Sequence, residues 1–136
     1  MKRILFVIPT LTQGGAERVL TTLLNYIDEK QYNAAIMVVD MRGDVYSHEI
    51  PKDIEIIDLK CSRVRNAVPK IILNVWRYRP DVVMSTLGHL NIAIAMSRLF
   101  MPRGVKFVAR ETIVISEKLK RVKYKKLWKR AHVAFY

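Results

Sequence analysis

Two adjacent glycines, Gly14 and Gly15, mark the stretch near the start of the chain that is best suited to chemistry. An apolar run precedes them and a helical pattern follows, which places them in a strand–helix turn. Glycine lets a ligand approach the backbone closely, and a helix N-terminus offers unpaired N–H groups and a positive dipole end. This combination suits an anion such as phosphate, with Gln13 and Glu17 beside it. A tight turn without a ligand explains the same residues equally well.

The sequence excludes several common kinds of site. The glycine loop does not follow the dinucleotide pattern G-x-G-x-x-G, and no G-x-x-x-x-G-K-[ST] occurs, which disfavours nicotinamide and nucleoside triphosphate sites of those types. No histidine or cysteine has a partner at metal-ligand spacing, so we expect no metal and no resident cofactor. No G-x-S-x-G elbow is present either.

Two further positions carry chemically useful side chains at the ends of expected strands. His89 could exchange a hydrogen bond with a substrate hydroxyl, although a solvated or capping histidine fits the same pattern. Arg110 could bind a phosphate through its forked guanidinium. The alternative for Arg110 is a rim ion pair with Glu111, which contributes little to stability.

Positive charge is unevenly distributed along the chain. The net charge is +12, and the segment from Arg103 onward holds 11 Lys/Arg against 2 Glu, compared with 13 Lys/Arg and 10 acidic residues before it. Such asymmetry points to a polyanionic partner. Wound as a helix, residues 118–130 carry basic side chains on nearly every side, which favours lying on an anionic membrane surface.

A basic, solvated helix packed on the sheet is the alternative for residues 118–130. We do not expect nucleic-acid binding, because no signature of a nucleic-acid-binding fold accompanies the charge. The residues assigned to the anionic surface are Lys118, Lys120, Arg121, Lys123, Lys125, Lys126, Trp128, Lys129 and Arg130.

Apolar segments alternate with helical patterns along the whole chain. We expect strands at residues 4–8, 34–40, 54–59, 81–86, 105–110 and 131–136. We expect helices from residue 16 to about 27, from a first turn containing Pro69 to Pro80, over 91–100 and over 116–130. This alternation predicts an α/β fold: a Rossmann-like, doubly wound parallel sheet of about six strands with helices on both faces. The length predicts a single domain over residues 1–136.

Ligands of such sheets bind beyond the C-terminal ends of the strands, where the strand order reverses. We therefore expect residues 12–17, 86–89 and 110–112 to share one surface. The single cysteine, Cys61, allows no intramolecular disulfide and favours a reducing cytoplasm.

Several of these segments together resemble one enzyme family. The opening strand at residues 4–10, the loop Gly14-Gly15-Ala16-Glu17-Arg18 and the stretch Arg79-Pro80-Asp81-Val82-Val83 before His89 are three of them. Val108-Ala109-Arg110-Glu111 and Lys129-Arg130-Ala131-His132-Val133 complete the pattern. The whole chain resembles the N-terminal half of a GT-B-fold glycosyltransferase of the retaining family 4 type.

The resemblance implies a division of labour between two domains. The N-terminal domain carries the acceptor site, and a C-terminal domain binds most of the nucleotide-diphosphate-sugar donor. The glycine loop would lie near the donor phosphates and His89 near the transferred sugar. The acceptor would be a glycan or a lipid-linked molecule, and the basic helix would hold the protein on the inner face of the cytoplasmic membrane.

The 136 residues contain no donor-binding domain of this kind. We therefore expect a truncated, single Rossmann-like domain without transferase activity of its own. The alternative is a non-enzymatic Rossmann-like module that binds nucleic acid or another polyanion through its basic C-terminal helix.

Overall fold

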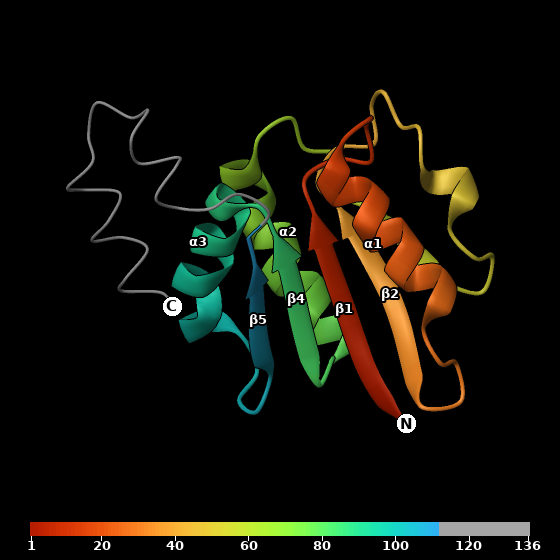
Figure 1. The fold of residues 1–136 in the computed structure, drawn as a ribbon. Helices are drawn as coiled ribbons and strands as arrows, with labels where there is room; N and C mark the ends of the chain where they lie inside the picture. Colours follow the sequence, from red (N-terminus) through yellow and green to blue (C-terminus); the bar gives the residue numbers. More distant parts are fainter. Residues whose placement is uncertain (112–136) are drawn as a thin grey trace.

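A computed structural model describes residues 1–111 and shows a five-stranded parallel sheet (Figure 1). Its strands are β1 (Lys2–Ile8), β2 (Tyr32–Val38), β3 (Glu55–Asp58), β4 (Val82–Thr86) and β5 (Lys106–Arg110), in the order β3-β2-β1-β4-β5. All four strand pairings are parallel. This confirms the expected Rossmann-like α/β fold. The helix and strand expected at 116–130 and 131–136 lie outside the described residues.

Helices cover both faces of the sheet, as expected for a doubly wound fold. Helix α1 (Gly15–Tyr26) lies on one face, whereas α2 (Val64–Tyr78) and α3 (Gly88–Ser97) lie on the other (Figure 1). Two short 3-10 turns complete the elements: η1 (Ser47–Glu49) precedes β3 and η2 (Arg98–Phe100) follows α3. The turn η1 lies in the polar loop between β2 and β3.

The apolar strands are explained by burial on two faces at once. Successive side chains of a strand point to opposite faces. Leu5 of β1 accordingly packs in one core with Val75 of α2, and Phe6 packs in a second core with Leu24 of α1. Both faces of the central strand are therefore dry, which requires continuous rather than alternating hydrophobicity.

Two local expectations were wrong. Helix α2 begins at Val64, so Pro69 is its sixth residue rather than part of its first turn. The proline lies on the exposed side of the helix, where its missing N–H leaves the carbonyl of Arg65 accessible to water. Helix α3 begins at Gly88, so His89 lies in its first turn rather than in a loop before a helix starting at 91.

Acidic and basic residues are also separated within the part of the chain that precedes the basic C-terminal segment. Residues 1–58 hold 6 Lys/Arg and 9 Asp/Glu, whereas residues 59–110 hold 10 Lys/Arg and a single acid, Asp81. The first group builds α1 and β1–β3, and the second builds α2, α3, β4 and β5. The summed charge of the first 102 residues does not reveal this division, because the two groups carry net charges of opposite sign.

Two neighbouring leucines of α1 test the packing of this fold. Leu24 is 1% exposed and Leu23 is 43% exposed. Replacing Leu24→Ala removes a fully buried side chain and should lower the free energy of unfolding by about 2–5 kcal/mol. Leu23→Ala should lower it by less than about 1 kcal/mol. Equal losses in urea denaturation would contradict the packing of α1 described above.

Candidate functional site

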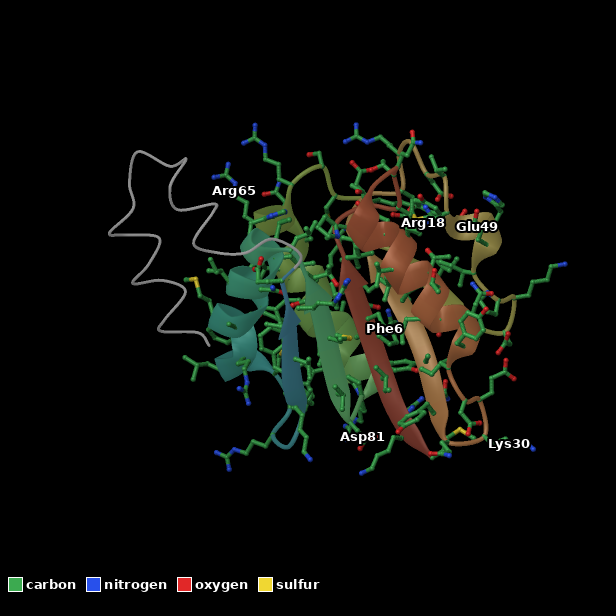
Figure 2. All side chains as sticks on the ribbon, in the orientation of Figure 1. Phe6, Arg18, Lys30, Glu49, Arg65 and Asp81 are labelled. Atoms are coloured by element: carbon green, nitrogen blue, oxygen red, sulfur yellow. The ribbon has the colours of Figure 1, made fainter. Side chains whose placement is uncertain are left out.

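The structure places the segments that we expected to share one surface at the C-terminal ends of neighbouring strands. Strands β1, β4 and β5 are neighbours, with Val7 in register with Ser85 and Thr86 in register with Arg110. The strand order reverses between β1 and β4, because β2 extends the sheet on one side of β1 and β4 on the other. The loop after β1, the start of α3 and the end of β5 therefore border the crevice where such folds bind ligands. Figure 2 shows Arg18 and Arg65 toward this end of the sheet, and Asp81 and Lys30 at the opposite end.

The glycine loop forms the start of α1. Gly14 is the N-cap residue, and its carbonyl oxygen accepts the first helical hydrogen bond, from the backbone N–H of Arg18 at 3.2 Å. A Cβ atom on Gly14 would lie 2.3 Å from Oε2 of Glu17. A side chain at Gly14 would therefore displace the Glu17 carboxylate, which folds back over the helix start.

The Glu17 carboxylate lies in a small polar cluster. The side chain is 7% exposed, and its Oε1 accepts a hydrogen bond from the Thr10 hydroxyl at 3.3 Å. The Thr10 hydroxyl also lies 3.2 Å from that of Thr12. A carboxylate at this position is stabilised by the positive end of the helix dipole. It also competes with any external anion for the same field, so Glu17 weakens rather than builds a phosphate site.

Gly15 differs from Gly14 in its surroundings. A Cβ atom on Gly15 would meet nothing within 4 Å. Packing therefore does not require glycine at this position, and the backbone at the first residue of α1 is open to approach from outside. Gln13 beside it is exposed. Of the two glycines, Gly15 is the one whose lack of a side chain could serve a ligand.

Arg110 is on the same face of the sheet as α1. Met84 packs against the core under α1, and Thr86, two residues along β4, points to the same face. Arg110 is in register with Thr86 and shares that face. Its side chain is half-buried. The cation and the N-terminus of α1 thus border the crevice from one side of the sheet.

His89 lies on the other side of the sheet. Its side chain is exposed and lines a groove of about 600 Å³ between α2 and α3, together with Arg65 and Val68. The structure therefore does not place His89 beside Gly14 and Gly15. It separates the candidate residues into Gly14, Gly15 and Arg110 on the α1 face and a histidine on the α2–α3 face, at the same ends of the strands.

A buried polar cluster that the sequence analysis missed ties β4, α3 and β5 together. The Ser85 hydroxyl donates to Oδ1 of Asn91, and both side chains are almost fully buried. The Asn91 amide donates to the backbone carbonyl of Arg110 at 3.1 Å and to Oε1 of Glu111 at 3.2 Å. Glu111 is thus engaged by Asn91. The sequence feature that could have revealed this cluster is Asn91, a polar residue inside an apolar helix that follows the strand ending in Ser85 and Thr86.

Leu87 has a strained backbone between β4 and α3. Its φ of 79° and ψ of 135° lie in a region that side-chain-bearing residues rarely adopt. Such a conformation costs on the order of 1–3 kcal/mol and persists where the surroundings hold it in place. Here the Leu87 N–H donates to the carbonyl of Arg110 at 3.3 Å, and its carbonyl accepts from the N–H of Asn91 at 2.9 Å.

A second polar hollow lies at the ends of β2 and β3, lined in part by Asp40, Arg42 and Lys60. The Arg42 guanidinium donates to Asp40 with Nη2 2.6 Å from Oδ2. The side-chain hydrogen bonds from Arg42 hold the pKa of Asp40 below its usual range. Because this carboxylate is already paired with Arg42, Asp40 is a poor candidate for a catalytic acid or base.

No protein-family model matches the chain, and no curated protein matches it. Within residues 1–111, no group of three or more His, Cys, Asp or Glu side chains could hold a metal ion. No helix among those residues combines the length and hydrophobicity needed to cross a membrane. The basic residues expected on an anionic surface, Lys118 to Arg130, lie outside the described part of the chain.

The two glycines make a matched pair for testing the loop. Gly14→Ala should displace the Glu17 carboxylate from Thr10 and lower the free energy of unfolding by about 0.5–1.5 kcal/mol. Gly15→Ala should leave the stability unchanged or raise it by up to about 1 kcal/mol, since alanine favours the helix. The loss from Gly14→Ala should shrink in a Glu17→Ala background, as measured by a double-mutant cycle, and the part that remains reflects the poorer N-cap that alanine makes. Additive effects would contradict the contact between Gly14 and Glu17.

Asn91 provides a test of the polar cluster. Asn91→Ala leaves the buried Ser85 hydroxyl without this partner and should lower the free energy of unfolding by about 1–3 kcal/mol. Asn74→Ala is the control, because that amide donates to the carbonyl of Lys70 at a more exposed position. Its loss should stay below about 1 kcal/mol. The Ser85 cluster has no structural role if thermal and urea unfolding give both variants the same stability.

Proposed function

We propose that this chain is the acceptor-side domain of a glycosyltransferase that moves a sugar from a nucleotide-diphosphate donor to a glycan or lipid-linked acceptor. The observation that carries the proposal is the reversal of strand order between β1 and β4, where the open backbone at Gly15 and the cation of Arg110 lie at the C-terminal ends of the strands on the α1 face. A sugar-phosphate end could approach the helix N-terminus there without a steric barrier from Gly15. The resemblance in sequence supports the same assignment.

In this proposal the chain's residues share the work of transfer. The bond between the anomeric carbon and the phosphate oxygen of the donor breaks, and the nucleoside diphosphate leaves with that oxygen. The acceptor oxygen bonds to the same carbon with retention, and the proton of the acceptor hydroxyl passes to the leaving diphosphate. Arg110 and the N–H groups at the start of α1 stabilise the negative charge on the leaving diphosphate. His89 contacts the acceptor, which approaches from the α2–α3 side of the edge. A second, donor-binding domain supplies the remaining contacts to the nucleotide.

The test is a comparison of affinities for UDP-glucose, GDP-mannose and glucose 1-phosphate by calorimetry on the 136-residue chain. Binding should be weak, and Arg110→Gln should weaken it further, by about tenfold, through loss of a charge-assisted hydrogen bond. Glu17→Gln should strengthen it, because it removes a negative charge from the helix N-terminus. No transfer of radiolabelled sugar is expected from this chain alone.

Lys106→Gln is the matched control for Arg110→Gln. Lys106 lies on the same strand and the same face, at the opposite end of β5. It should leave the affinity unchanged. Equal effects of the two substitutions would show that general charge, not the crevice, attracts the sugar phosphate. Tight, salt-sensitive binding of oligonucleotides without sugar-phosphate binding would instead favour the polyanion-binding alternative, which the excess of basic residues in 59–110 supports.

A further inference from the structure

Large apolar side chains protrude from the face formed by α2, α3 and η2. Leu99 is 92% exposed and Phe100 is 67% exposed, although both lie on the short turn that ends α3. Contiguous apolar surface exposed to solvent marks an interaction site rather than ordinary surface. We call these exposed residues the η2 surface: Leu73, Trp76, Met96, Leu99 and Phe100.

The η2 surface is held in place by the fold. The Trp76 indole N–H donates to the carbonyl of Phe100 at 2.8 Å, which joins α2 to η2. Met96 and Phe100 also line the apolar groove between α2 and α3, together with Ile72. The protruding side chains are therefore presented by packed elements, and their exposure is not the result of a loose loop.

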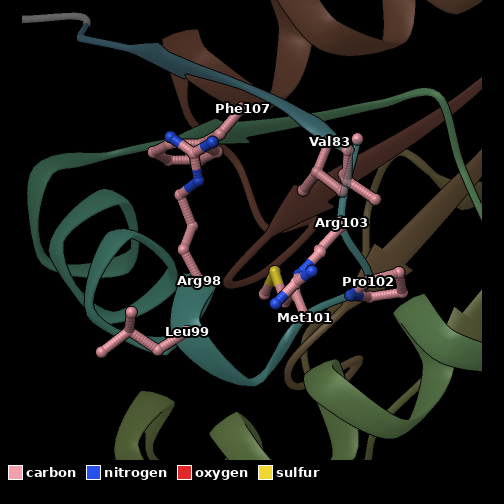
Figure 3. A pocket seen from close by; sticks show the side chains of 9 residues that line it. Val83, Arg98, Leu99, Met101, Pro102, Arg103 and Phe107 are labelled. Atoms are coloured by element: carbon pink, nitrogen blue, oxygen red, sulfur yellow. The ribbon is translucent and has the colours of Figure 1, made fainter.

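Basic side chains border the η2 surface. Arg98 and Arg103, on either side of Leu99 and Phe100 in the chain, line a hollow of about 540 Å³ next to Phe107 (Figure 3). Residues 82–110 contain no acidic residue. The preceding acid, Asp81, accepts a hydrogen bond from the backbone N–H of Arg3 at 2.8 Å. Two basic side chains thus lie beside Leu99, at one side of the apolar surface.

We propose that the η2 surface docks on an anionic lipid bilayer. Leu99 and Phe100 enter the headgroup region, Trp76 lies at the interface, and the two arginines contact lipid phosphates. Exposed aliphatic and aromatic groups with basic side chains at one side suit this partner, since burial of the apolar groups and attraction to anionic headgroups act together. The inference rests on residues 73–103 and does not depend on the proposed sugar-transfer function or on residues 118–130.

Sedimentation with phosphatidylglycerol–phosphatidylcholine vesicles tests this surface in the full chain. The double substitution Leu99→Asp/Phe100→Asp should reduce partitioning by more than tenfold. Arg98→Gln/Arg103→Gln should reduce it by about tenfold and flatten its salt dependence. Tyr26→Asp is the matched control, because Tyr26 is 85% exposed on α1, on the opposite face, and should have no effect. Circular dichroism verifies that each variant is folded.

The two tryptophans of the chain distinguish this surface from the basic C-terminal segment. In a Trp128→Phe variant, Trp76 should shift its emission to the blue on vesicle binding and be quenched by brominated lipids. Vesicle binding during which Trp76 stays unquenched would overturn the proposal, as would the absence of binding to anionic vesicles. A dimer in sedimentation equilibrium that Phe100→Asp converts to a monomer would also overturn it, since a second copy would then cover the surface.

Discussion

Strand β1 is the constraint on which the rest of the structure depends. It pairs with β2 along one side and with β4 along the other, and buries side chains on both faces. Because both neighbours are parallel to it, the chain must cross over the sheet between strands, and each crossover places its elements on one face. The strand order reverses beside β1, and ligands of such sheets bind at this point, so the candidate site follows from the central strand's position.

The central position of β1 also separates acidic from basic elements at the C-terminal ends of the strands. Elements that lead away from β1 toward β3 cover the α1 face, and elements that lead through β4 to β5 cover the other face. Acidic residues are concentrated in the first set and basic residues in the second. On the α1 face, the acidic Glu17 from the first set and the basic Arg110 from the second thus lie at the same ends of the strands. An anion at this place is attracted by Arg110 of β5 and by the dipole of α1, and it is repelled by Glu17.

Much of the fold could be predicted from the sequence, because buried parallel strands need continuous apolar runs such as Ile4–Ile8 and helices need a periodic face. The site was harder to predict from the sequence. It depends on the directions in which side chains point, and hydrophobic patterns do not encode these directions. His89 follows β4 as expected, yet the rotation of α3 turns its side chain into the α2–α3 groove. Nothing in the local sequence shows that Glu17 folds back over Gly14 or that Leu87 takes a positive φ. The Glu17 side chain is held by the Thr10 hydroxyl in the preceding loop, and the Leu87 backbone is held by Arg110 of the neighbouring strand.

The central claim is that the crevice on the α1 face receives a sugar phosphate. Chemical-shift mapping of backbone amides during titration with UDP-glucose tests it most directly, because it locates the ligand without assuming a site. The largest changes should fall on the amides of residues 13–16 and of Arg110. Changes confined to the α2–α3 groove, or none at millimolar ligand, would contradict it.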